Sequence, residues 1–125
     1  MPFILLRIMA EIGWKGAEMP IKNLFKQIPA DLPEEFFESI IKSRSFKLKR
    51  IISKGHATPA GEWYDQQDNE WVLLLQGSAG LRLDGKETTT MKPGDYILLP
   101  AGLKHRVEWT DSTTETIWLA LHFPV

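Results

Sequence analysis

From residue 46 to the C-terminus, the sequence consists of short runs of strand-forming residues, each bounded by residues that favour turns. Asp84-Gly85 is a strong hairpin signal, and Pro100 and Gly102 mark a corner that these two residue types form at low cost. Short strands with turns at intervals of about eight to twelve residues, and no long helix between them, are typical of antiparallel sandwiches and barrels. The pattern therefore predicts an all-β domain over residues 46–125, with strands in the runs 45–53, 70–77, 81–87, 87–92, 95–100, 105–109 and 115–123.

Residues 33–43, PEEFFESIIKS, have the spacing of one amphipathic helix. Pro33 suits the first helical position, and the two glutamates that follow it favour the positive end of the helix dipole. Large apolar residues then recur at three- and four-residue intervals. We therefore predict one N-terminal helix that packs on the sheet. Residues 1–18 are expected to be an N-terminal extension, because Met19 begins a stretch that resembles a natural start, and residues 1–45 are placed outside the barrel.

Composition narrows the class of partner. Hydrophobic residues make up 43% of the chain and charged residues 25%, as in ordinary globular proteins, and the net charge of −1 gives no broad attraction for nucleic acid or an anionic membrane. The apolar run near the N-terminus is interrupted by Arg7 and Glu11 and is too short to span a bilayer. We expect a cytoplasmic protein. The chain has no cysteine, which excludes disulfides, thiolate metal sites and a cysteine nucleophile.

Two segments of the β region carry motif-like spacings. Residues 94–105 follow the pattern G-x5-P-x-G-x2-H, which ends at His105, and Glu70 is followed after six residues by Gly77. Together these segments resemble the two motifs of the cupin superfamily. The second motif matches at every defining position, whereas the first keeps its glutamate and glycine and lacks its HxH pair. The resemblance covers about residues 46–123 and implies an antiparallel double-stranded β-helix, or jelly-roll barrel.

The alternation of side chains along strands indicates where the two motifs meet. In a small barrel, successive strand residues point alternately into and out of the interior, which has room for one ligand. If Glu70 points inward, Val72 and Leu74 do so as well. His105 begins the strand that follows the Pro100–Gly102 corner, and the corner would aim its imidazole at the cavity. We therefore predict that Glu70 and His105 meet inside a closed β-cavity.

The resemblance also implies a divalent metal, which cupins hold with the HxH pair, the glutamate and the histidine of the second motif. In this chain the last two are Glu70 and His105. With three residues before Glu70 the HxH positions fall on Tyr64 and Gln66, and with four they fall on Trp63 and Asp65. Either Gln66 or Asp65 could complete a mixed nitrogen and oxygen site for iron, manganese, zinc or nickel.

His122 is a further candidate, because it shares one face of the last predicted strand with Trp118 and Ala120. It could replace a missing metal ligand or act as an acid or base, or it could simply bond to backbone or water. Tyr64 lies in the segment EWYDQ, which has the apolar bodies and polar tips of a small-molecule pocket wall. We expect Tyr64 or His122 to move protons if the protein is an enzyme.

Three functions agree with these residues. The first is a metal-dependent dioxygenase, isomerase or lyase that acts on a small organic acid or sugar. The second is a non-catalytic cupin that binds a small ligand as a sensor without metal, which the missing HxH pair favours. The third is a metal-free epimerase-like enzyme with His105 as base and Tyr64 as acid. In all three the partner is a small molecule, and the resemblance favours a homodimer.

Overall fold

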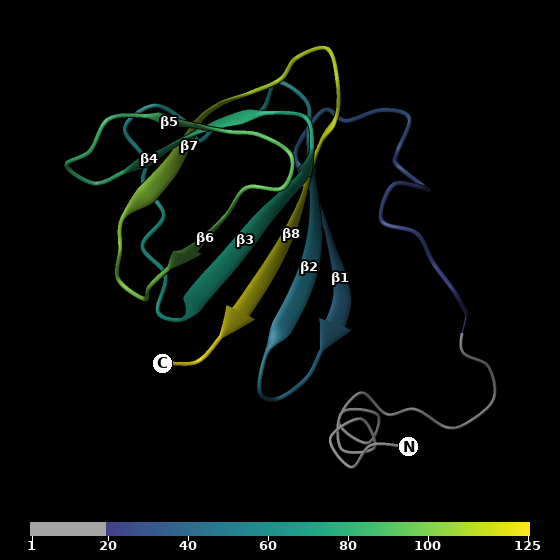
Figure 1. Ribbon diagram of the computed structural model, residues 1–125, viewed down its shortest axis with the longest axis horizontal. Helices are drawn as coiled ribbons and strands as arrows, with labels where there is room; N and C mark the ends of the chain where they lie inside the picture. The colour runs from purple at the N-terminus through teal and green to yellow at the C-terminus, as the bar shows by residue number, and fades with distance from the viewer. Residues whose placement is uncertain (1–19) are drawn as a thin grey trace.

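The computed structural model describes residues 20–125, which form two antiparallel sheets that face each other (Figure 1). The larger sheet has the strand order β1 (Phe36–Lys42), β2 (Lys47–Ser53), β8 (Thr116–Phe123), β3 (Asn69–Gln76), β6 (Tyr96–Leu99). The smaller sheet has the order β5 (Thr89–Met91), β4 (Ala79–Leu83), β7 (His105–Thr110). Each run predicted as a strand overlaps one of the strands β2 to β8, which confirms the all-β antiparallel jelly-roll fold.

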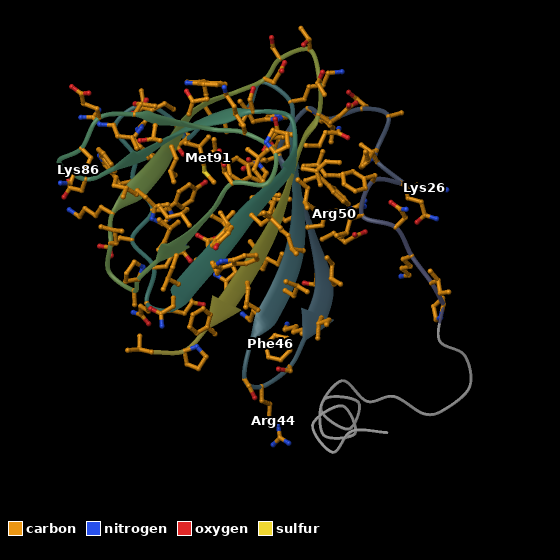
Figure 2. All side chains as sticks on the ribbon, in the orientation of Figure 1. Lys26, Arg44, Phe46, Arg50, Lys86 and Met91 are labelled. Carbon is orange, nitrogen blue, oxygen red and sulfur yellow. The ribbon has the colours of Figure 1, made fainter. Side chains whose placement is uncertain are left out.

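The core lies between the two sheets. β3 lies between β8 and β6 in the larger sheet, and every second residue from Glu70 to Leu74 is buried, so one of its faces points into the core. The buried core residues are Val72, Leu74, Ala79, Leu81, Met91, Leu99 and Trp118. Met91, labelled in Figure 2, belongs to β5 of the smaller sheet, so both sheets contribute to one core. No helix in residues 20–125 is long and apolar enough to cross a membrane.

The prediction of a helix over residues 33–43 is wrong, because residues 36–42 form the edge strand β1. β1 pairs with β2 from Phe36 opposite Ile52 to Lys42 opposite Lys47, so its backbone hydrogen bonds go to the sheet. A bulge breaks the two-residue alternation of β1. As a result, Phe36 and Ile41 pair with residues that lie on the same face of β2. This irregular spacing imitates a helical period. Aromatic and β-branched residues fit a pleated strand well.

The region that precedes the predicted barrel is therefore partly built into the larger sheet, through β1. The predicted extension, residues 1–18, lies outside the described residues. The first described segment is fixed by Arg50, whose guanidinium donates to the carbonyl oxygens of Leu24, Lys26 and Gln27. Arg50 also lies 3.1 Å from Glu38 Oε1, and Figure 2 shows it on the side of the sheet nearest Lys26. This contact holds the N-terminal segment against the sheet.

Candidate functional site

A cavity of about 300 Å³ opens between the two sheets. Its walls are mostly apolar and come from both sheets: Phe37, Ile51, Val72, Leu81, Leu99, Val107 and Trp118. Its polar lining consists of Glu35, Lys49, Tyr64, Gln66, Glu70, His105 and His122. A concave apolar site with a few convergent polar groups is the usual form of a small-molecule site, and this volume suits a small ligand.

Strand register brings the polar groups together. Glu70 on β3 stands opposite His122 on β8, and its other neighbour across the sheet is Leu99 on β6. His105 begins β7 in the opposite sheet, directly after the Pro100–Gly102 corner. Gly102 has a φ of 81°, which favours glycine, and its amide donates to the carbonyl of Gln66 at 2.8 Å. The corner therefore fixes both the start of β7 and the segment that carries Gln66.

Tyr64 and His105 are neighbours through their backbones. Tyr64 N donates to His105 O at 2.8 Å, and His105 N donates to Tyr64 O at 3.1 Å. Their rings lie with centroids 5.8 Å apart and an angle of 33° between the planes. This pairing places the phenol beside the imidazole, with the Tyr64 side chain partly exposed and the His105 side chain buried.

Glu70 is the centre of the side-chain contacts. Its Oε1 accepts a hydrogen bond from Gln66 Nε2 at 3.0 Å and lies 3.5 Å from His105 Nε2. Its Oε2 lies 3.3 Å from His122 Nε2, and His122 Nδ1 lies 3.6 Å from Asp68 Oδ2. Carboxylates and imidazoles therefore alternate in one series of side-chain contacts, which runs from Asp68 through His122 and Glu70 to His105.

The proton on His105 has a defined place. Its Nδ1 lies 2.9 Å from the carbonyl oxygen of Leu103, and because a carbonyl can only accept, Nδ1 carries the proton. In the neutral ring, Nε2 is then the nitrogen with the free lone pair. Gln66 Nε2 lies 3.4 Å from this nitrogen. The amide of Gln66 can thus donate to both Glu70 and His105.

These contacts shift the pKa values in opposite directions. Burial raises the pKa of Glu70, but hydrogen bonds from the protonated His105 ring, from His122 and from Gln66 outweigh it and hold the pKa well below its usual range. Burial lowers the pKa of His105, yet the hydrogen bonds to Glu70 and Leu103 outweigh burial and raise the pKa above 6.5. Glu70 is therefore a stable carboxylate, and His105 accepts a proton more readily than an ordinary histidine.

The Tyr64 phenol gives up its proton less readily than an ordinary tyrosine. Burial, together with the carboxylates of Glu35, Glu62 and Glu70, raises the pKa of its phenol above 10.0. The phenol consequently keeps its proton at neutral pH and can donate a hydrogen bond.

Arg106 orders the loop that leads to Tyr64. Its guanidinium donates to the carbonyl oxygens of Thr58, Pro59 and Glu62 at 2.8–3.2 Å, and its Nε lies 3.1 Å from Glu108 Oε1. The side chain is almost fully buried. Arg106 therefore positions one wall of the site without facing the cavity.

The structure brings five of the six sequence-predicted site residues to the cavity: Tyr64, Gln66, Glu70, His105 and His122. Asp65 is exposed and does not line it. The choice between the two alignments of the missing HxH pair thus falls on Tyr64 and Gln66. The metal-binding and catalytic roles of these residues stay predictions.

Sequence reasoning missed three polar groups of the site. Asp68 approaches His122, Lys49 lines the cavity from β2, and Glu35 accepts a hydrogen bond from Ser53. Asp68 stands two residues before Glu70, a spacing that could have indicated a second acidic group near the site. Lys49 shares a strand face with Ile51, but the register that turns this face inward is set by pairing with β8.

The donor types in this cluster, imidazole nitrogen with carboxylate and amide oxygen, are those that iron, manganese, zinc and nickel accept. Their arrangement is different from a metal centre. Within residues 20–125, no group of three or more His, Cys, Asp or Glu side chains is placed to hold a metal ion. Moreover, Gln66 turns its NH2 group, not its oxygen, toward Glu70. The residues as arranged do not fit the predicted metal.

The family follows from this fold and from the sequence. A family model described as the Cupin domain matches residues 51–122. The chain belongs to the cupin family, and the resemblance identified from its two motifs is confirmed. Among curated proteins, none matches the chain.

Solved structures of other proteins share this fold. A proposed mannose-6-phosphate isomerase from Ralstonia eutropha JMP134 is similar with a TM-score of 0.82 and 41% identity, over 86% of this chain and 100% of that protein. A cupin superfamily protein from Desulfitobacterium hafniense DCB-2 has a TM-score of 0.69 and 16% identity, over 87% and 94% of the two chains. An RmlC-like cupin with a double-stranded β-helix fold from Methanocaldococcus jannaschii has a TM-score of 0.62 and 15% identity, over 78% and 87%. The last two likenesses establish the fold alone.

Proposed function

We propose that the protein is a cupin enzyme that isomerises a small anionic hydroxy-carbonyl compound by moving a proton within the cavity. The observation that carries the proposal is the pairing of His105 with Tyr64, one group that readily accepts a proton and one that keeps its own. Both groups line the cavity. Moving a proton between two carbons requires such a base, together with a donor for the carbonyl oxygen.

His105 is the proposed base. Its Nδ1 is held by Leu103, so Nε2 is the atom that takes the proton from the carbon beside the carbonyl group. The electron pair of that C–H bond forms the C=C bond of an enediolate, and the former carbonyl oxygen takes the negative charge. The neighbouring hydroxyl then gives its proton to that oxygen, its own oxygen becomes the new carbonyl oxygen, and the same Nε2 returns the abstracted proton to the former carbonyl carbon. Glu70, ionised and 3.5 Å away, stabilises the imidazolium that exists between the two transfers.

Tyr64 is the proposed donor to the oxygen on which negative charge develops. Its phenol remains protonated because its pKa is raised, and donors that are already oriented toward the developing charge stabilise it most effectively. His122 has a supporting role in this proposal. It connects Asp68 to Glu70 and so fixes the carboxylate in front of His105.

Lys49 indicates an anionic ligand. It lines the cavity from β2, and within the described part of the chain its ammonium group has no hydrogen-bond or ion-pair partner. The two buried arginines offer no donors to the ligand, because Arg50 and Arg106 do not line the cavity and donate to backbone carbonyls instead. One free ammonium suits one carboxylate. The similarity to a proposed mannose-6-phosphate isomerase supports the reaction class, and it makes a sugar phosphate the alternative anion.

The experiment is a solvent-exchange screen. The protein is incubated in D2O with 2-hydroxy acids, 2-oxo acids, free aldoses, free ketoses and mannose 6-phosphate, and NMR follows the loss of the proton beside each carbonyl group. We expect exchange with at least one small carboxylate. His105→Asn should slow it by about 100-fold or more, and Tyr64→Phe by about 10- to 100-fold.

Two control variants are matched to these changes. Tyr96→Phe alters an exposed tyrosine on β6 that does not line the cavity, and His56→Asn alters a loop histidine outside the cavity. Neither should change the exchange rate. Binding of a carboxylate without exchange would replace the proposal by the non-catalytic binding function, and exchange that survives His105→Asn would remove His105 as the base.

A further inference from the structure

Gln66 contacts both Glu70 and His105, the two residues that the cupin resemblance implies as metal ligands. Its Nε2 lies 3.0 Å from Glu70 Oε1 and 3.4 Å from His105 Nε2. Those two atoms lie 3.5 Å from each other. The amide nitrogen therefore stands against the carboxylate and the imidazole at once, at the point on which both converge.

The chemistry of the three groups dictates which end of the amide faces them. A carboxylate can only accept hydrogen bonds, and the neutral His105 ring presents a lone pair at Nε2 because Nδ1 donates to Leu103. Two acceptors in contact repel each other unless a positive or hydrogen-bearing group lies between them. The two hydrogens of the Gln66 NH2 group supply this attraction, as a cation would.

The second oxygen of Glu70 is also engaged. His122 Nε2 lies 3.3 Å from Oε2, whereas His105 approaches Oε1, and His122 is itself held by Asp68. Glu70 thus stands between two imidazoles, and their nitrogens approach different oxygens. Ligands of one metal ion would instead direct their lone pairs at one common point. Within residues 20–125, no group of His, Asp and Glu side chains is placed to hold a metal.

We propose that the side-chain amide of Gln66 takes the place of a divalent metal in this cupin, so that the polar cluster is complete without one. A single substitution, Gln66→His, removes the bridging NH2 group and adds an imidazole nitrogen beside Glu70 and His105. That variant acquires a metal site that the natural chain does not have. The inference concerns the composition of the site and is independent of the reaction proposed above.

The test compares metal binding by the natural chain and by Gln66→His. Each protein is treated with a chelator, dialysed, and titrated with Mn²⁺, Zn²⁺, Ni²⁺ and Co²⁺ by calorimetry, with metal content measured separately after purification without added metal. We expect far less than one metal per natural chain, and a melting temperature that EDTA does not change. Gln66→His should bind about one metal per chain, at least 100-fold more tightly, since even outer-shell changes alter metal affinity by about 10- to 100-fold.

Gln67→His is the matched control, because it makes the same change at the next residue, which is exposed and does not line the cavity. It should bind metal no better than the natural chain. The double variant Gln66→His/Glu70→Gln should lose the gained affinity. A natural chain that retains about one metal, lost in His105→Ala, would overturn the inference whether or not Gln66→His folds. A folded Gln66→His without gained affinity would overturn it as well.

Discussion

The carboxylate of Glu70 meets the imidazole of His122 across the pairing of β3 with β8, with 3.3 Å between Oε2 and Nε2. The two residues are far apart in the sequence and directly opposite in the sheet. Both side chains are largely buried, and within residues 20–125 Glu70 Oε2 has no other side-chain partner. A buried carboxylate oxygen that loses its partner costs about 1–3 kcal/mol.

His122→Ala should therefore lower the free energy of unfolding by about 1–3 kcal/mol, because Glu70 Oε2 loses its only side-chain partner within residues 20–125. Urea denaturation followed by tryptophan fluorescence measures the change. His56→Ala is the control, since His56 lies in a loop and its imidazole accepts a single backbone hydrogen bond, from Lys54, within residues 20–125. Equal stability of His122→Ala and the natural chain would show that the contact with Glu70 contributes nothing.

Stability should also depend on pH through His105, whose pKa in the folded protein lies above 6.5. The folded state then binds this proton more tightly than the unfolded chain. Its contribution to stability is fully present below pH 6.5 and is lost as the pH rises through the folded-state pKa. Urea denaturation at a series of pH values should show this loss, and Glu70→Gln should reduce it because the charge that raises the pKa is gone. A loss of equal size in Glu70→Gln would contradict the assigned cause.

Arg106 offers a prediction about loop position. Arg106→Lys should weaken the three contacts to loop carbonyls and lower stability by about 1–3 kcal/mol, with a loss of ligand affinity as Tyr64 loses its fixed position. Arg82→Lys is a close control, because Arg82 also contacts Glu108 and approaches Trp63 but is about half exposed. Denaturation and ligand titration measure both effects. Similar losses in the two variants would mean that burial of Arg106 is unimportant.

In the proposed function, Lys49 makes the cavity prefer an anionic ligand. Lys49→Met keeps most of the side-chain volume and removes the charge, so a carboxylate found by the exchange screen should bind about tenfold more weakly. Lys47→Met makes the same change on the same strand, at a residue that is exposed and does not line the cavity. Calorimetric titration of both variants at low and high salt measures the affinity for the carboxylate, and only Lys49→Met should weaken it. An uncharged compound that binds better than its carboxylate analogue would contradict the role of Lys49.

The fold and part of the site could be predicted because their signals are local. Turn residues such as Asp84-Gly85, and the alternation along β3 and β8, are determined by neighbours in the sequence. β1 was mistaken for a helix because its bulge and its pairing with β2 are long-range features. Likewise, Asp65 and Gln66 are both plausible polar groups in the sequence, and only the bridge between Tyr64 and His105 determines which of them faces the cavity.

The contribution of Lys49 and Asp68 could not be predicted for a related reason. Lys49 is one of several lysines in a basic stretch, and its strand faces the cavity only because β2 pairs with β8 in the observed register. Asp68 lies just outside β3, where alternation no longer applies, and it reaches His122 through the start of the strand pairing. Positions of this kind depend on how strands align and not on residue type.

The protonation of His105 tests the account most directly, because both the proposed base and the bridging role of Gln66 depend on it. Long-range ¹H–¹⁵N NMR of the histidine rings, followed over a pH titration, reports the protonated nitrogen and the pKa. We predict a neutral His105 that carries its proton on Nδ1, with a pKa above 6.5 that falls in Glu70→Gln. A neutral ring protonated on Nε2, or a pKa at or below 6.5 that Glu70→Gln leaves unchanged, would contradict the account.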